Sequence, residues 1–157
     1  MRLKVAFMGQ CEYDKGEKKV KYYDYENKRF IPYEYPRNSL PDKHYCEFHD
    51  SDYAQTNPDD VMKSFYTLAD ETVLNPKPLF CIGFYLPREV NLTNKEFKDR
   101  IYFSHATFTG RASFSYSNFI DEVKFDKSSF PSPKTGKDSK DNTALIRFDY
   151  STFRKRV

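Results

Sequence analysis

The stretch IYFSHATFTGRASFSYSNFIDEVKFDKSSF, residues 101–130, returns a phenylalanine after five residues, then after six, and repeats this alternation. Aligned in elevens, the chain from residue 90 reads VNLTNKEFKDR, IYFSHATFTGR, ASFSYSNFIDE, VKFDKSSFPSP and, after an interruption, IRFDYSTFRKR. Self-similarity at a fixed period is typical of repeat architectures. We therefore predict that the second half of the chain is built from stacked repeats.

The repeats are predicted to be strands and not helices. In each one, apolar residues stand at offsets of 0, 2 and 7, which on a helix would point toward about 0°, 200° and 340°, so the middle one would face away from the others. In a strand, residues two apart share a face. A small or branched residue precedes nearly every phenylalanine by two positions: Ile101, Ala106, Ala112, Ser117, Val123, Ser128, Ile146 and Ser151.

The segments YFSHATF, ASFSYSNF and VKFDKSSF resemble the pentapeptide-repeat family, whose members wind as right-handed, four-sided parallel β-helices with large and small residues facing inward. The resemblance implies a mainly β fold: a solenoid of about two and a half coils, capped by a small N-terminal α+β region with one clear helix. The sixth residue at every second corner gives coils of 22 residues, longer than is usual in that family.

Three segments are expected along the chain. Residues 1–56 are a Tyr-rich, Cys/His-containing region, residues 57–89 a capping helix and a buried strand, and residues 90–157 the repeats with an inserted loop at 131–145. The helix is predicted from NPDDVMKSFYTLAD, where Asn57 can cap it and Pro58 suits its first turn. KPLFCIGFYLP follows as an apolar strand, with Cys81 a buried thiol.

Composition limits the class of protein. The chain has 15 Phe and 13 Tyr but no Trp, so most burial comes from aromatic rings. Three cysteines do not make a disulfide framework. We see no secretory signal and no apolar run long enough to cross a bilayer, and we expect a cytoplasmic protein without a membrane partner.

The segment HYCEFHDSDY, residues 44–53, contains a Cys-x-x-His spacing that suits two corners of a tetrahedral zinc site. Cys46 and His49 are these ligands, and Cys11 is a candidate third. His44 is a candidate fourth, because in a strand it shares a face with Cys46. The first half also resembles the N-terminal region of archaeal members of the family, which implies a small zinc-binding module.

Two alternatives to structural zinc stay open: a degenerate site that has lost its metal, or simple packing of these side chains. The resemblance calls for a further upstream cysteine, and this chain instead has Tyr22, Tyr23 and Asp24 near that place. Cysteine and histidine are the ligand types that select zinc over harder cations.

Three functions compete. A non-enzymatic scaffold for a protein partner is favoured, because the inward residues are committed to packing; exposed strand edges also make a homodimer conceivable. Residues 90–157 carry 13 Lys and Arg against 8 Asp and Glu, which argues against the acidic, DNA-like surface of some bacterial members. Nucleic-acid binding would use Lys124, Lys127, Arg147, Arg154, Lys155 and Arg156.

The third hypothesis is a Cys-dependent enzyme. It would use Cys46 as the nucleophile, with His44 or His49 as its base and Asp50 or Asp52 to orient that base. The chain has no glycine-rich phosphate loop, HExxH motif or serine-elbow motif. We therefore expect no enzymatic activity.

Overall fold

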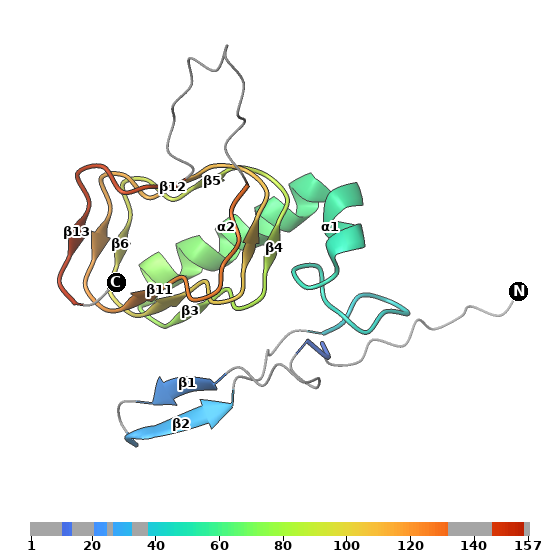
Figure 1. The fold of residues 1–157 in the computed structure, drawn as a ribbon, viewed down its shortest axis with the longest axis horizontal. Helices are drawn as coiled ribbons and strands as arrows, with labels where there is room; N and C mark the ends of the chain where they lie inside the picture. The colour runs from blue at the N-terminus through green and yellow to red at the C-terminus, as the bar shows by residue number, and fades with distance from the viewer. Residues whose placement is uncertain (1–10, 14–20, 25–26, 33–37, 132–145, 156–157) are drawn as a thin grey trace, which may run out of the picture. The chain divides into compact units, whose positions relative to one another are not determined.

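The computed structural model describes residues 11–13, 21–24, 27–32, 38–131 and 146–155 (Figure 1). For residues 21–24 and 31–32 it describes the backbone but not the side chains. Contacts divide the chain into two compact units, Met1–Ser51 and Asp52–Val157. The second unit consists mainly of short strands in parallel sheets, so the fold is mainly β as predicted. Part of the predicted loop at 131–145, residues 132–145, lies outside the described residues.

The first unit contains one antiparallel strand pair. Strand β1 (Lys21–Asp24) pairs with β2 (Arg29–Pro32) in a register that places Asp24 opposite Arg29. Lys28, just before β2, has a φ of 50°, which is the left-handed conformation that short hairpin connections use.

Two helices open the second unit. Helix α1 (Ser51–Thr56) is short, and α2 (Pro58–Leu74) is the helix predicted from the Asn-Pro-Asp-Asp start. The side chain of Asn57 does not cap α2; its amide donates to the carbonyl of Tyr53 instead, at 3.1 Å. The buried face of α2 holds Val61, Met62, Phe65, Ala69 and Thr72.

Four parallel ladders form the rest of the second unit. The chain returns to the same ladder after 22 residues, except that 34 residues separate Ala112 from Ile146 and Asn118 from Thr152, on either side of the inserted loop. The ladders are β3 (Leu79–Phe80), β7 (Ile101–Tyr102) and β11 (Val123–Lys124); β4 (Tyr85–Leu86) and β8 (Thr107–Phe108), extended by a bridge from Thr107 to Ser129; β5 (Val90–Asn91), β9 (Ala112–Ser113) and β12 (Ile146–Arg147); and β6 (Glu96–Phe97), β10 (Asn118–Phe119) and β13 (Thr152–Phe153).

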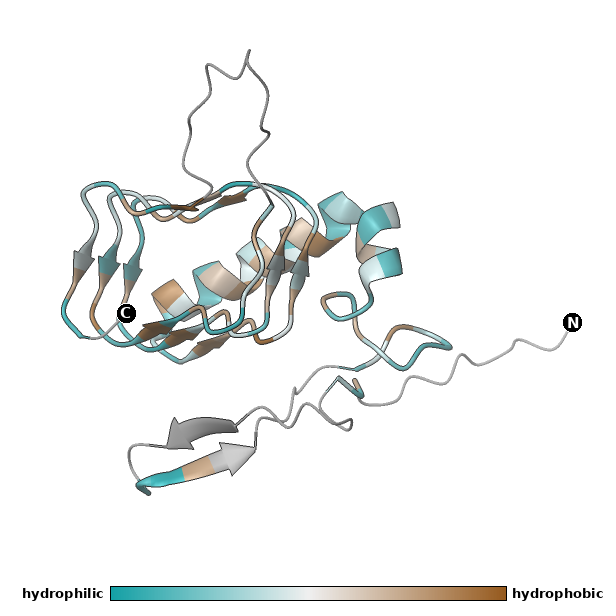
Figure 2. Ribbon diagram, in the orientation of Figure 1, coloured by the Kyte–Doolittle hydropathy of each residue, from teal (hydrophilic) through white to brown (hydrophobic). Residues whose placement is uncertain are grey.

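We call each passage through the four ladders a round: the first is 79–100, the second 101–122 and the third 123–155. Figure 1 shows the strands of successive rounds side by side. Figure 2 shows hydrophobic residues in the strands and along α2, with hydrophilic residues at many corners.

Two kinds of corner explain the alternating spacing. At five of the six five-residue spacings a backbone bond closes a four-residue turn, as from the N–H of Ala106 to the carbonyl of Phe103 at 2.9 Å; in the turn from Leu92 to Lys95 the Ser117 hydroxyl bridges the two groups instead. The third residue of these turns has positive φ, which is typical of type II turns; the set is Gly83, Asn94, His105, Tyr116, Lys127 and Tyr150. The six-residue corners are bends that need one more residue.

The phenylalanines stack from round to round. Rings one round apart lie nearly parallel with centroids 4.7 to 5.4 Å apart, as in Phe103 on Phe125 and Phe119 on Phe153. Three of the small inward residues are serines whose hydroxyls donate to a carbonyl of the preceding round: Ser117 to Leu92, Ser128 to Phe103 and Ser151 to Phe114. The polar atom in the interior is thus satisfied.

The ladders begin at Leu79, eleven residues before the predicted start at residue 90. KPLFCIGFYLP is not one strand but β3, a corner at Gly83 and β4. The phenylalanine pattern did not extend to this segment because Cys81, Leu86 and Leu92 occupy positions where later rounds have phenylalanine. Cys81 is fully buried, as predicted.

Helix α2 contacts β3, β4 and β6, all in the first round. Lys95, at a position where later rounds have a small inward residue, reaches Asp70 of α2 with its ammonium group 2.7 Å from the carboxylate. At Lys95, the departure from the repeat pattern is thus accompanied by an ion pair with the helix.

Candidate metal centre

Three predicted ligands, Cys11, Cys46 and His49, come together in the first unit. The backbone N–H of Glu12 donates to the carbonyl of His44 at 2.8 Å, which places Cys11 beside Cys46. The N–H groups of His49 and Asp50 both donate to the carbonyl of Cys46 at 3.0 Å, and this tight turn brings the imidazole back over the thiol.

The ligand atoms have the spacing that a small tetrahedral cation needs. Nδ1 of His49 lies 3.3 Å from Sγ of Cys11 and 3.3 Å from Sγ of Cys46, and one atom from each residue falls within 4.8 Å of the others. Ligands of tetrahedral zinc are about 3.5 Å apart for sulfur and nitrogen. The three side chains are therefore close enough to hold a metal ion.

The imidazole is held in position by its neighbours. The ring of Tyr13 stacks on that of His49 with centroids 3.9 Å apart and an interplanar angle of 9°. The backbone N–H of Cys46 donates to Sγ of Cys11 at 3.3 Å, a bond that favours the thiolate. Cys11 and Cys46 are both buried, so their sulfur atoms are shielded from water.

The two thiols share one proton unequally. Hydrogen bonds from the Cys46 thiol and from His49 lower the pKa of Cys11 to about 4, although burial acts in the opposite direction. The same bond to Cys11, together with burial and the negative charge on Cys11, raises the pKa of Cys46. One thiolate is thus present at neutral pH, and a bound cation would displace the second proton.

His44 does not join this group, contrary to prediction. Its Nδ1 lies 3.2 Å from a carboxylate oxygen of Glu12, and its side chain is 82% exposed. The prediction assumed a strand, but the chain turns here: the N–H of Lys43 donates to the carbonyl of Leu40, and Asp42 has a φ of 56°. His44 and Cys46 therefore do not share a face.

Within the described part of the chain, no fourth His, Cys, Asp or Glu joins the three. Asp50 makes an ion pair with Lys43 at 3.3 Å. The side chains of Tyr22, Tyr23 and Asp24, which stand where a further ligand was expected, are outside the described residues.

Cys46 is a poor candidate for a nucleophile in this arrangement. It is 0% exposed, and its raised pKa keeps it as the thiol. Asp52, named as a possible orienting carboxylate, lies in the first turn of α1. Reactive cysteines are accessible and have a lowered pKa, so the geometry suits a ligand better than an attacking group.

Three of the basic residues named for nucleic-acid binding are paired with carboxylates. Lys124 lies 3.3 Å from Glu122, Lys155 lies 2.9 Å from Asp121, and the Nε of Arg147 donates to Asp149 at 2.7 Å. Arg154 and Lys127 are exposed, and Arg156 is outside the described residues.

A pocket on the second unit was not predicted. Two exposed tyrosines, Tyr116 and Tyr150, stack beside it. The available signal was their position: SYSN (115–118) and DYST (149–152) put tyrosine at the same corner of two repeats.

Comparison of the chain with models of protein families, with curated proteins and with solved structures finds no match. Among the described residues, no helix is both long enough and apolar enough to cross a membrane.

Proposed function

We propose that this protein is a non-enzymatic interaction scaffold: a short right-handed parallel β-helix of the pentapeptide-repeat kind, joined to an N-terminal module stapled by zinc. The observation that carries the proposal is the 22-residue register shared by the ladders. Side chains that point inward are used up in stacking and in serine bonds to the backbone. Recognition is then left to the outward side chains and corners.

Two features support the β-helix. Each ladder adds one strand per round, as expected where a chain coils along one axis. Connections between parallel strands of one sheet are right-handed in nearly all proteins, which supports the assigned hand. Repeat proteins commonly use such surfaces to bind partners.

The outward rows differ from one another, as a specific binding surface requires. One row joins Glu96, Asn118 and Thr152 by side-chain hydrogen bonds of 3.3 and 2.6 Å. Another packs Phe80 against Tyr102 at 5.4 Å, with the ammonium of Lys124 over the Tyr102 ring at 5.5 Å. Tyr102 itself is buried, at 2% exposure, so on that row a partner would meet only the partly exposed Phe80 and Lys124, and on the other row the polar side chains.

Photo-crosslinking tests the scaffold. A photoreactive phenylalanine replaces one outward residue on each row: Lys124, Ser129, Asn91 or Thr152. In extract of the native host we expect one protein to be captured from one row or two adjacent rows, and excess unlabelled protein to compete. Capture of nothing from any row, or equal capture from all four, would contradict the proposal.

Zinc in the first unit is proposed on a separate observation, the convergence of Cys11, Cys46 and His49. Two thiolates and an imidazole are a ligand set that zinc prefers. The role is structural: the ion would tie the segment at Cys11 to the turn at 46–49 in a unit whose buried hydrophobic residues among those described are few. Elemental analysis of tag-free protein, purified without chelator, should give one zinc per chain; less than a tenth would remove the proposal.

Nucleic-acid binding is the alternative. The pairing of Lys124, Arg147 and Lys155 with carboxylates leaves a weaker cationic surface than the sequence indicates. A filter-binding assay at low salt separates the two proposals: affinity that falls steeply with added salt would favour nucleic acid, and no retention would favour the protein partner.

A further inference from the structure

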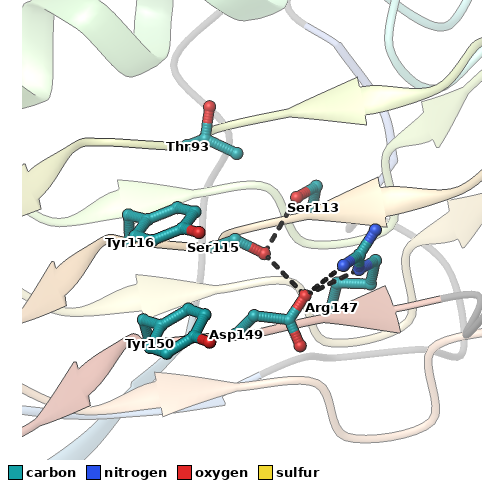
Figure 3. A pocket seen from close by; sticks show the side chains of 7 residues that line it. All are labelled: Thr93, Ser113, Ser115, Tyr116, Arg147, Asp149 and Tyr150. Atoms are coloured by element: carbon teal, nitrogen blue, oxygen red, sulfur yellow. Dashed lines mark hydrogen bonds and ion pairs between the residues drawn. The ribbon is translucent and has the colours of Figure 1, made fainter.

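The pocket on the second unit is an open depression over β9 and β12 with a volume of about 550 Å³ (Figure 3). This volume is in the range of small-molecule sites. Its walls are of three kinds: the stacked rings of Tyr116 and Tyr150, the hydroxyls of Thr93, Ser113 and Ser115, and an ion pair between Arg147 and Asp149. None of these seven residues is aliphatic.

The two tyrosines are placed against their conformational preference. Both have positive φ, 59° at Tyr116 and 56° at Tyr150, as do the residues at all the equivalent corners, Gly83, Asn94, His105 and Lys127; of these, glycine and asparagine are the types that accept this conformation most readily. The two residues are 61% and 81% exposed, so burial does not compensate. The positive φ thus belongs to the turn of the repeat, and these two corners differ from the others in presenting exposed tyrosine rings.

The stacked rings offer a fixed aromatic surface. Their centroids are 5.1 Å apart and the interplanar angle is 13°. Figure 3 shows the rings one above the other, beside Ser115 and on the same side of the sheet as the ion pair. A ligand can lie against a ring and reach the polar groups at once.

The polar groups form a connected and electrically neutral network. Ser113 donates to Ser115 at 3.3 Å, Ser115 to Asp149 at 3.4 Å, and Arg147 to Asp149 at 2.7 Å. Among the described residues, the hydrogen bonds from Ser115 and Arg147 both end on Oδ2 of Asp149. The other carboxylate oxygen, Oδ1, can therefore accept a hydrogen bond from a ligand. The arginine fork has donors beyond its Nε. Donors and acceptors therefore stand side by side.

We infer that this pocket binds a neutral saccharide of one or two pyranose units. Sugar hydroxyls both donate and accept, as the network requires, and the C–H face of a pyranose ring meets the negative face of an aromatic ring favourably. A ligand rich in apolar side chains would find no aliphatic wall.

Two other ligands fit less well. The rings of Tyr116 and Tyr150 are in contact with each other, so there is no slot between them for a proline ring or a nucleobase. A phosphate would approach Arg147 only beside the carboxylate of Asp149, which repels it. The inference does not depend on the scaffold proposal, since a sugar site needs no protein partner.

A backbone-amide NMR titration tests the site. The full chain is titrated to 20 mM with methyl glucoside, methyl galactoside, maltose, cellobiose and lactose, and separately with an octathymidylate and a decaproline peptide. We expect at least one saccharide to shift the amides of Thr93, Ser115 and Tyr116 saturably, with a dissociation constant in the millimolar range.

Variants locate the binding. Tyr150→Asn and Arg147→Gln should each weaken it tenfold or more, while Lys127→Asn, at the same kind of corner on another side, should leave it unchanged. Asparagine accepts positive φ, so Tyr150→Asn should stay folded and keep a dispersed NMR spectrum. If Tyr150→Asn does not fold, the Arg147→Gln variant tests the site in its place. No shift with any saccharide, equal shifts in Tyr150→Asn, or a response only to the nucleotide or the peptide would overturn the inference.

Discussion

The ring of Phe65, on α2, lies 6.5 Å from the ring of Phe103, which belongs to the second round. The first round stands between α2 and the second along the ladder, and at the matching position it has Cys81. A thiol occupies less space than a phenyl ring, and with Cys81 at this position Phe65 lies within ring-contact distance of Phe103. Helix α2 thus contributes a ring to the aromatic stack.

This relationship predicts a double-mutant result. Phe65→Ala should lower the free energy of unfolding by about 3–5 kcal/mol, because a large ring leaves the core. Cys81→Phe should lower it by about 1–3 kcal/mol through overpacking. Combined, the new ring fills the space of the old one, and the loss should be clearly smaller than the sum. Chemical denaturation measures all three, with Lys63→Ala, on the exposed face of α2, as the control.

Strict additivity in that cycle would mean that Phe65 and Cys81 do not share a space. Additivity would also indicate that the size of the side chain at position 81 is not limited by Phe65, since the effect of Cys81→Phe would then be the same with or without the Phe65 ring.

The inward serines Ser117 and Ser128 should contribute unequally to the free energy of unfolding, because they make different numbers of hydrogen bonds. The hydroxyl of Ser117 donates to the carbonyl of Leu92 at 2.7 Å and accepts from the N–H of Lys95 at 3.0 Å. The hydroxyl of Ser128 donates to the carbonyl of Phe103 at 2.6 Å. Ser117→Ala removes two bonds from a buried site and should cost about 2 kcal/mol, whereas Ser128→Ala should cost about 1 kcal/mol.

Alanine fits this position without strain, since Ala106 occupies it in another repeat. The difference between the two variants therefore reports the hydrogen bonds and not the change in volume. Ser129→Ala, at an exposed site, is the control for thermal unfolding; equal losses at 117 and 128 would refute the grading.

Cobalt spectroscopy reports the ligands of the proposed metal site one by one. Cobalt-loaded protein should show a thiolate charge-transfer band that weakens in Cys11→Ser and in Cys46→Ser, while His49→Gln should alter the visible bands of a tetrahedral ion. His44→Gln and Cys81→Ala are the controls and should leave the spectrum unchanged, because His44 pairs with Glu12 and Cys81 lies in the other unit. A spectrum insensitive to Cys11 would exclude it as a ligand.

The sequence predicted the interior better than the surface. Phenylalanine spacing predicts parallel stacking directly, since a ring that must meet its counterpart in the next round needs a fixed number of residues between them. The first half of the first round, residues 79–89, escaped prediction because Cys81 and Leu86 stand where later rounds have phenylalanine; Phe65, which lies near the stack, comes from a helix distant in sequence from Phe103.

The metal group shows the same limit. Cys46 and His49 are three residues apart, so their convergence follows from one local turn. Excluding His44 required knowledge of the turn at Asp42, which no apolar period announces. The pocket at Tyr116 and Tyr150 depends on two repeats being adjacent in space, and its residues carry no motif in the sequence.

The ion pair between Asp121 and Lys155 predicts an acid-dependent contribution to stability. Burial acts to raise the pKa of Asp121, but the hydrogen bond from Lys155 at 2.9 Å and that from the N–H of Glu122 at 2.7 Å outweigh it, and the pKa is lowered below its ordinary value. A lowered pKa in the folded state means that the stabilisation is complete above the unfolded pKa and is lost as pH falls through the folded one.

Because the Lys155 side chain is 61% exposed, the contribution of the ion pair to the free energy of unfolding should stay below about 1 kcal/mol. Asp121→Asn should therefore be slightly less stable than the parent at pH 7, and the difference should shrink as pH falls below about 4. Urea unfolding between pH 7 and 3 measures it, with Asp126→Asn at an exposed corner as the control; a difference that grows toward low pH would show that the carboxylate is not stabilised by Lys155.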